Sequence, residues 1–160
     1  MILIRSAGTG KSFTVFAICT YLDQCLKRCA PTAKASFIIR GETIHSLLQI
    51  SVDNENNNLK SDKLKKLQEE FENVIFLIID EFSMVSQKLF GFINKRLQEI
   101  KANNLHMGGI SVILVGDPGQ LLPVCGRPLY SNKANCPASI DGWNSYSKFE
   151  VVVMLETSER

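Results

Sequence analysis

A glycine-rich segment near the N-terminus carries the residue types that bind phosphate groups. It follows an apolar run over residues 1–4 and consists of Ala7, Gly8, Thr9, Gly10, Lys11 and Ser12. The glycines permit backbone angles that other residues avoid, so successive N–H groups can point into one concavity. The lysine is placed to reach the β- and γ-phosphates of a nucleotide, and the serine hydroxyl to hold Mg²⁺. The segment therefore predicts a P-loop that leads into a helix.

The segment departs from the full P-loop pattern at one position. The pattern G-x-x-x-x-G-K-[ST] places its first glycine at position 5, where this chain has Arg5. The alternative interpretation is a Gly/Ser turn before an amphipathic helix, but such a turn does not need Gly-Lys-Ser at the helix start. We expect Arg5 to lower the affinity for nucleotide, because its side chain occupies the tight first turn.

Two further candidate sites follow apolar runs that are typical of buried parallel strands. Residues 74–79 lead into Asp80 and Glu81, and residues 110–115 lead into a loop that contains Gln120. Ligands bind outside the carboxyl ends of such strands, so we expect these side chains to lie near the P-loop. There Asp80 would hold Mg²⁺, Glu81 would polarise the attacking water and Gln120 would contact the γ-phosphate. The alternatives are two acids that cap a helix and an ordinary loop amide.

Helical and strand patterns alternate along the chain, which predicts a single α/β domain with a parallel sheet. Besides the two buried strands, Glu150 begins a third one that ends at Leu155. Thr43 and Ser86 are expected to cap helices. We expect further helices over 11–26 and 63–72, a surface loop over 53–58 and irregular structure over 118–144.

Composition narrows the class of protein. The 160 residues are 45% hydrophobic with a formal net charge of +2, which is too small a charge to argue for nucleic-acid binding by itself. The five cysteines lack a C-x-x-C pair, so reduced thiols are favoured over a zinc site or a disulfide framework. No apolar run is long enough to span a membrane. The chain begins directly on an expected core strand, which suggests a fragment without a leader peptide.

Some side chains have both a nucleic-acid interpretation and a structural one. Trp143 and Phe149 are candidates for stacking on bases or for packing in the core. His45 is a candidate for a DNA contact or for a polar residue on a helix face. A group of lysines is a candidate for phosphate contacts or for a solvated helix face; it comprises Lys60, Lys63, Lys65 and Lys66.

Four segments occur in the order and spacing of helicase motifs. Residues 7–12 resemble motif I, residues 30–32 with 43–46 resemble motif Ia, residues 79–85 resemble motif II and residues 116–124 resemble motif III. Asp-Glu followed by Ser-Met, and then Gly-Asp-x-x-Gln-Leu-x-Pro-Val, is more specific than a P-loop alone. Over essentially its whole length the chain resembles the petite-integration-frequency (Pif) DNA helicases of superfamily 1, including the helicase domains of Helitron transposons.

The resemblance implies a P-loop NTPase with a RecA-like fold, which has three layers and a mostly parallel sheet. It implies ATP and Mg²⁺ as cofactors, 5′-to-3′ movement on single-stranded DNA and unwinding of duplex DNA. It also implies roles in DNA repair, recombination and telomere maintenance, in the nucleus or the mitochondrion. A second RecA-like domain is expected in the full-length protein, because this family hydrolyses ATP between two such domains. No membrane partner is implied.

The resemblance also assigns roles to single residues. Asp80 carries over as the metal-binding acid, Glu81 as the catalytic base and Gln120 as the γ-phosphate sensor. Arg160 matches the start of motif IV, whose arginine reaches the γ-phosphate. The phosphate and Mg²⁺ ligands are Lys11 and Ser12, and the residues expected on the DNA track are Pro31, Thr32 and His45.

Three departures from the family pattern bear on activity. The first P-loop glycine is missing, motifs V and VI are absent, and the stretch from Lys11 to Ala30 looks short for a helix plus a complete strand. Two alternatives therefore stay open beside a helicase motor domain. One is an inactive nucleotide- or single-strand-binding remnant of a transposon helicase. The other is an unrelated P-loop ATPase that does not bind DNA.

Overall fold

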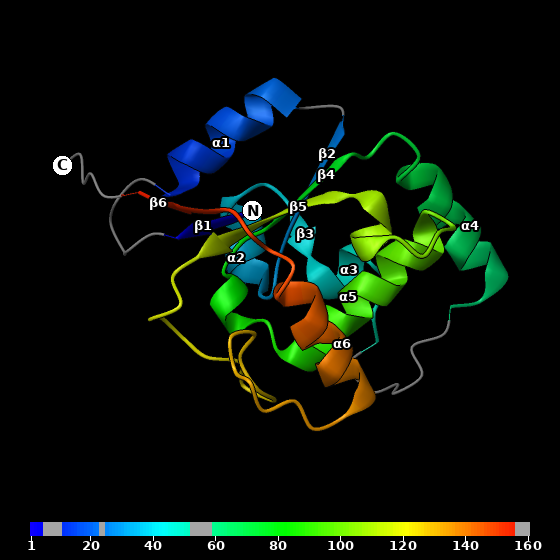
Figure 1. Cartoon of the computed structure of the whole chain (residues 1–160). Coiled ribbons are helices and arrows are strands. Elements are labelled where there is room, and N and C mark those ends of the chain that lie inside the picture. The colour runs from blue at the N-terminus through cyan, green and yellow to red at the C-terminus, as the bar shows by residue number, and fades with distance from the viewer. Residues whose placement is uncertain (5–10, 23–24, 52–58, 156–160) are drawn as a thin grey trace.

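A computed structural model describes residues 1–4, 11–22, 25–51 and 59–155. Within these residues six strands form one sheet in the order β3-β2-β4-β5-β1-β6, and every neighbouring pair is parallel (Figure 1). The strands are β1 (Ile2–Ile4), β2 (Leu26–Ala30), β3 (Glu42–Thr43), β4 (Phe76–Ile79), β5 (Ser111–Gly116) and β6 (Val152–Met154). The prediction of a parallel α/β sheet is thus confirmed.

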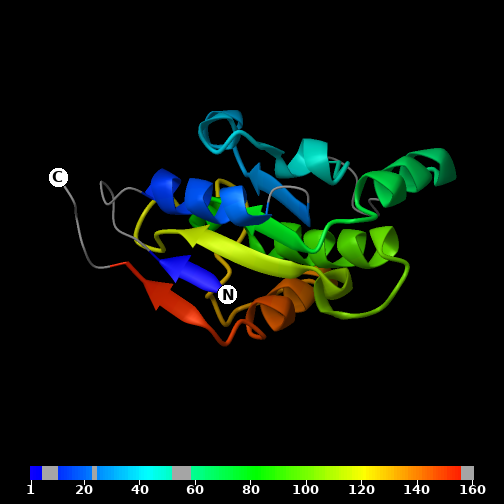
Figure 2. The ribbon, with the colours of Figure 1, turned by 90° about the horizontal axis from the view of Figure 1, so that it is seen from above.

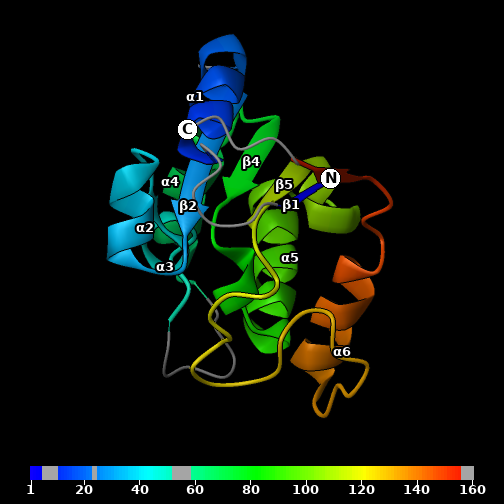
Figure 3. The same ribbon diagram turned by 90° about the vertical axis from the view of Figure 1, so that its left-hand side faces the viewer.

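Helices cover both faces of this sheet. They are α1 (Lys11–Leu22), α2 (Ala33–Ile38), α3 (Ile44–Leu47), α4 (Ser61–Glu70), α5 (Gln87–Ile100) and α6 (Pro137–Tyr146), with short 3₁₀ turns η2 (Phe82–Met84) and η3 (His106–Gly109). Helices α1 and α2 lie on one face, and α5 lies on the other with α6 beside it (Figures 2 and 3). The result is a three-layer arrangement. No helix among the described residues has the length and apolar character that crossing a membrane requires.

The alternation of side chains along each strand produces two separate hydrophobic cores. On the face covered by α1 and α2, Leu3, Ile78 and Ile113 pack with Val15 and Ala35. On the α5 face the neighbouring strand residues pack against that helix; this core includes Ile2, Leu77, Ile79, Leu114, Phe90, Ile93 and Leu97. Burial on both faces explains why the central strands are continuous apolar runs.

Both predicted helix caps are present. The hydroxyl of Thr43 accepts a hydrogen bond from the backbone N–H of Ser46 at 3.2 Å, and that of Ser86 accepts one from Leu89 at 3.2 Å. Each cap satisfies a backbone donor that the first turn leaves without a partner. These caps fix where α3 and α5 begin.

Two sequence-based expectations were wrong. The helix expected over 11–26 ends at Leu22, and a complete strand, β2, follows over Leu26–Ala30. The stretch from Lys11 to Ala30 is therefore long enough for both elements. The region 118–144, expected to be irregular, contains most of α6 (Pro137–Tyr146).

Helices α5 and α6 pack so closely that their backbones are in contact. A Cβ atom on Gly91 would lie 2.1 Å from the carbonyl oxygen of Ala138, and one on Gly142 would lie 1.9 Å from the carbonyl oxygen of Gln87. Only glycine at these two positions lets the helices approach so closely. Residues that usually weaken a helix are here the contact surface between two helices.

The cysteines that the structure describes are free thiols: Cys25, Cys29, Cys125 and Cys136. Burial raises the pKa of the Cys29 thiol, with a smaller contribution from the negative charge of Glu42. This thiol is part of the core and behaves as a small apolar side chain.

Candidate functional site

The register of the sheet brings the ends of the central strands together. Ile4 at the end of β1 pairs with Gly116 at the end of β5, and Ile79 at the end of β4 pairs with Leu114. The described residues that follow β4 and β5 therefore emerge at the edge of the sheet at which β1 also ends (Figure 3). This is the edge at which open α/β sheets bind their ligands.

Asp80 is a buried carboxylate at this edge. The residue is only 3% exposed to solvent. Its backbone N–H donates to the carbonyl oxygen of Cys29 at 2.9 Å, which continues the ladder between β4 and β2. One carboxylate oxygen, Oδ1, accepts a hydrogen bond from the backbone N–H of Glu81 at 2.9 Å. The backbone thus fixes the orientation of the side chain that the sequence predicts as the metal ligand.

Glu81 has a left-handed backbone conformation, with φ 53° and ψ 44°. A non-glycine residue in this region costs about 1–3 kcal/mol, and such strain is found most often at functional sites. The next residue, Phe82, lies so close to Gly116 that a Cβ there would be 2.9 Å from its Cδ1 atom. The chain therefore turns sharply at Glu81 and packs against the end of β5.

Gln120 lies in a tight turn that follows β5. The carboxylate of Asp117 accepts a hydrogen bond from the N–H of Gly119 at 2.9 Å, and its backbone carbonyl accepts one from the N–H of Gln120 at 3.1 Å. These bonds stabilise the turn locally. Gln120 is half-buried, and its turn follows β5, which pairs with the strand that leads into Asp80.

A cavity of about 440 Å³ lies beside these strand ends and brings together the three residues predicted to contact DNA. Pro31 and Thr32 follow β2, and His45 is in α3. The loop after β5 contributes the opposite wall, and the full lining is Pro31, Thr32, His45, Ile50, Ser51, Met84, Ser86, Lys88, Leu89, Phe92, Pro123, Val124, Cys125 and Gly126. We refer to this cavity as the groove.

The groove has a basic and aromatic pair that sequence reasoning missed. Lys88 and Phe92 are one turn apart on α5, and the lysine Nζ is 5.9 Å from the centre of the phenylalanine ring. A cation and an aromatic face are suitable contacts for a phosphate and a base. The sequence indicated this pair only by its spacing, because residues four apart on a helix lie on the same face. Ser86, as the predicted cap, defines where that helix begins.

Thr32 has a structural partner as well as a position in the groove. Its hydroxyl accepts a hydrogen bond from the N–H of Ala35 at 3.2 Å and caps α2. That bond orients the Thr32 side chain, and it holds the chain as it leaves β2. A change at Thr32 would therefore alter both the groove wall and the start of the helix.

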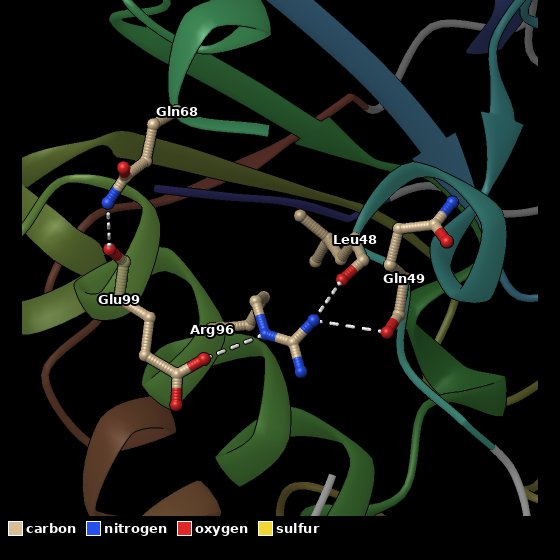
Figure 4. Close-up of polar contacts among 5 residues, drawn as sticks. All are labelled: Leu48, Gln49, Gln68, Arg96 and Glu99. Carbon is tan, nitrogen blue, oxygen red and sulfur yellow. Dashed lines mark hydrogen bonds and ion pairs between the residues drawn. The ribbon is translucent and has the colours of Figure 1, made fainter. Parts of the chain in front are cut away.

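Arg96 of α5 holds the segment that carries His45 in place (Figure 4). The guanidinium NH1 donates to the carbonyl oxygens of Leu48 at 2.8 Å and Gln49 at 3.0 Å, and Nε donates to Glu99 at 3.0 Å. Burial lowers the pKa of Arg96, and the nearby carboxylate of Glu99 opposes that shift. This buried cation ties the C-terminal end of α3 to α5.

Several predicted site residues lie outside the described residues, namely Ala7, Gly8, Thr9, Gly10 and Arg160. Lys11 and Ser12 begin α1, as the P-loop pattern predicts for the backbone, and their side chains are likewise outside the description. For the P-loop contacts, the sequence prediction therefore stands as a prediction.

The structure bears on the alternatives left open for aromatic and basic residues. Phe149 is half-buried and packs against the core, with its ring centre 6.0 Å from that of Phe90, which favours the packing interpretation. Trp143 on α6 is 37% exposed. The four lysines on and before α4 are exposed, which fits both of their interpretations; they are Lys60, Lys63, Lys65 and Lys66.

The described residues fit a Mg²⁺ ion that binds together with phosphate groups. Mg²⁺ is usually held by one or two carboxylates, with phosphate oxygens and water completing the octahedron. Asp80 supplies one buried, oriented carboxylate at the strand edge from which the chain leads into Lys11 and Ser12. Asp80 is the described residue that would hold the ion, and the sequence predicts the Ser12 hydroxyl as a second ligand.

Comparison with known proteins gives one consistent result. The family model described as "PIF1-like helicase" matches residues 1–160. The ATP-dependent DNA helicase Pif1 of a Psychrobacter strain is 34% identical over 131 residues, covering 78% of this chain and 20% of that protein. The ATP-dependent DNA helicase PIF1 of Candida albicans is 32% identical over 162 residues, covering 97% of this chain and 17% of that protein.

Solved structures agree with these relatives. The crystal structure of the Candida albicans Pif1 helicase superposes with a TM-score of 0.77 at 28% identity, covering 97% of this chain and 35% of that one. A Bacteroides Pif1 bound to single-stranded DNA gives a TM-score of 0.71 at 28% identity, covering 78% of this chain and 30% of that one. These neighbours confirm the RecA-like fold. The chain spans about a fifth of the length of the curated relatives named above.

Proposed function

Because this chain belongs to the PIF1-like helicase family, we propose that residues 1–160 form the first RecA-like motor domain of an ATP-dependent DNA helicase. The whole protein would hydrolyse ATP to move 5′ to 3′ on single-stranded DNA and to unwind duplex DNA. One observation carries the proposal: the buried, oriented carboxylate of Asp80 lies at the sheet edge where β1 ends and the chain leads into the helix that begins at Lys11.

We assign each residue of the nucleotide site one role. Lys11 would bind the β- and γ-phosphates, and Asp80 and Ser12 would hold a Mg²⁺ ion, whose chemistry there would be to neutralise phosphate charge. Glu81, in its strained turn, orients the attacking water and accepts its proton. Gln120, which follows the adjacent strand, contacts the γ-phosphate. Solved Pif1 helicases in complex with ADP-AlF4, an ATP-analogue state, support nucleotide binding in this family.

The groove is the candidate surface for single-stranded DNA. Pro31, Thr32 and His45 form one side, and Lys88 and Phe92 add a cation and an aromatic face. The groove is next to the turn that follows Glu81, since Met84 lines it. This proximity would allow nucleotide and DNA to influence each other. Relatives are described as bound to single-stranded DNA and as unwinding forked duplex DNA.

We further propose the cellular setting that the relatives suggest. They include ATP-dependent DNA helicases named PIF1 and RRM3 in yeasts. DNA repair, recombination and telomere maintenance in the nucleus or the mitochondrion are the processes proposed here. A transposon-derived remnant that binds nucleotide or single-stranded DNA without turnover is the alternative, and turnover after fusion to a second motor domain decides between the two.

The experiment that tests the proposal is phosphate release by this chain and by a fusion to the second motor domain of the Candida albicans relative. A trans-acting arginine is worth about 10³–10⁵ in rate for phosphoryl transfer. We therefore expect almost no turnover from residues 1–160 alone and DNA-stimulated turnover from the fusion. Robust turnover by the unfused chain would refute the requirement for a second domain.

The same fusion tests the role of Glu81. Glu81→Gln keeps the shape of the side chain but cannot accept a proton, so turnover should fall about 10²–10⁴-fold while ATP still binds. The matched control is Glu72→Gln, at an exposed position after α4, which should leave turnover unchanged. Undiminished turnover in the Glu81→Gln fusion would remove Glu81 from the role of base.

A further inference from the structure

Ser83 has a buried hydroxyl group without a hydrogen-bond partner among the residues that the structure describes. The residue is 2% exposed and is the middle residue of η2. Leaving a buried polar group unpaired costs about 1–3 kcal/mol, and buried hydroxyl groups in proteins are nearly always paired. An alanine would fill the same place without this cost. A hydrogen-bond partner in another state of the protein would explain why a serine occupies this position.

The position of Ser83 lies between the nucleotide site and the groove. Two residues earlier the chain makes the left-handed turn at Glu81, and the preceding residue, Phe82, packs on Gly116, where the Gln120 turn begins. The following residue, Met84, lines the groove. One short 3₁₀ turn thus begins directly after the proposed catalytic base and ends at the groove.

The backbone of this turn is hydrogen-bonded while the Ser83 side chain is not. The N–H of Met84 donates to the carbonyl oxygen of Glu81 at 3.0 Å, and that of Val85 donates to Phe82 at 3.0 Å. Because these bonds join the residues on both sides of Ser83, a shift of the Glu81 turn would move Met84 as well. A side-chain hydroxyl that gains a partner after such a shift would stabilise the moved position.

We propose that Ser83 is a positioning residue whose hydroxyl gains its hydrogen-bond partner when nucleotide binds, and that η2 thereby transmits nucleotide binding to the DNA groove. This inference rests on the function proposed above. It predicts that the Ser83 hydroxyl contributes to the coupling between the two ligands rather than to the stability of the free protein. Coupling between two sites is reciprocal and commonly amounts to about 5–150-fold in affinity.

The test compares Ser83→Ala with the wild-type chain in two measurements. The first is thermal unfolding without ligand, where Ser83→Ala should be as stable as wild type or more stable, because no hydrogen bond is lost. The second is the dissociation constant for a fluorescent oligothymidine, with and without saturating Mg²⁺ and a non-hydrolysable ATP analogue. In wild type we expect the analogue to change this constant at least about fivefold, and in Ser83→Ala to leave it nearly unchanged.

The matched control is Ser139→Ala on α6, another buried serine, whose hydroxyl lies 3.1 Å from the Sγ atom of Cys136. It should retain wild-type coupling and should not gain stability. Full coupling in Ser83→Ala, or a wild-type chain that binds both ligands independently, would overturn the inference and leave the proposed function standing. A wild-type chain that binds no nucleotide would instead contradict the proposed function itself.

Discussion

Asp80 and Glu81 are adjacent acids with different surroundings, and the difference suits them to different roles. Asp80 continues the ladder of β4, is 3% exposed and has one oxygen occupied by a backbone N–H. Glu81 leaves the strand in a left-handed conformation and is half-buried. A carboxylate held by backbone bonds is a suitable fixed ligand, whereas one on a sharp turn is a suitable group to meet a water molecule.

Arg96 provides a test of how the groove wall is held. Arg96→Met keeps the apolar stem but removes the donor to the carbonyl oxygens of Leu48 and Gln49, and it leaves Glu99 without this ion pair. Removing one partner of a buried pair costs about 3–5 kcal/mol, and Glu99 is partly exposed, so we expect a loss of about 2–4 kcal/mol. Urea denaturation measures this loss.

The matched control for Arg96→Met is Lys95→Met, at the exposed neighbouring position on α5. A change at an exposed site is usually within about 0.5 kcal/mol. Equal stability of the two variants would show that Arg96 does not hold the end of α3. If Arg96→Met loses stability and the control does not, Arg96→Met should also bind single-stranded DNA more weakly. The reason is that Ile50 and Ser51, which line the groove, directly follow the two carbonyl groups that Arg96 holds.

At the level of elements, the contact between α5 and α6 depends on glycine. In an exposed helix, alanine is favoured over glycine by about 0.8–1.0 kcal/mol. Gly142→Ala should have the opposite effect, because the new Cβ would lie 1.9 Å from the carbonyl oxygen of Gln87. We expect a loss of about 1–3 kcal/mol, or more if the helices must separate.

Thermal and chemical unfolding of Gly142→Ala check this prediction against Asn144→Ala. Asn144 is exposed on the same helix, so its replacement by a better helix former should be neutral or slightly stabilising. If both variants gained stability, the close approach of α5 and α6 would be wrong. The comparison separates packing from helix propensity because both changes introduce the same residue.

The elements also show what the sequence could predict and why it failed elsewhere. Strands β4 and β5 were predictable because burial on both faces makes them continuous apolar runs. Strand β2 was not predictable, because Lys27 and Arg28 interrupt its apolar pattern. It lies near the edge of the sheet, where its neighbour on the outer side is the two-residue strand β3. Helix α6 was missed because Gly142 and its serines suggest a loop, whereas the glycine is the packing surface.

The candidate site was predictable where it depends on the ends of strands and not where it depends on tertiary contacts. Asp80, Glu81 and Gln120 follow apolar runs, so a parallel sheet brings them to one edge. The groove brings α3, α5 and the loop after β5 together. No local sequence pattern predicts that these three elements come together, which is why Lys88 and Phe92 were not predicted as groove residues.

For the whole molecule, the arrangement puts the residues of the proposed nucleotide site that the structure describes and the groove at a single edge of the sheet. The helices cover the two faces of the sheet (Figure 2), so the edge stays available for ligands. The central claim is that this edge binds Mg·ATP through the P-loop. That claim depends on Lys11 more directly than on any other side chain.

The decisive measurement is calorimetric titration of Mg·ATP into the wild-type chain and the Lys11→Ala variant, with Lys63→Ala on the exposed face of α4 as control. A charge-assisted phosphate contact is worth about 1.5–3 kcal/mol, so Lys11→Ala should weaken binding at least about tenfold or abolish it. Lys63→Ala should bind as wild type does. Equal affinity of the wild-type chain and Lys11→Ala would contradict the assignment of a P-loop and, with it, of a helicase motor domain.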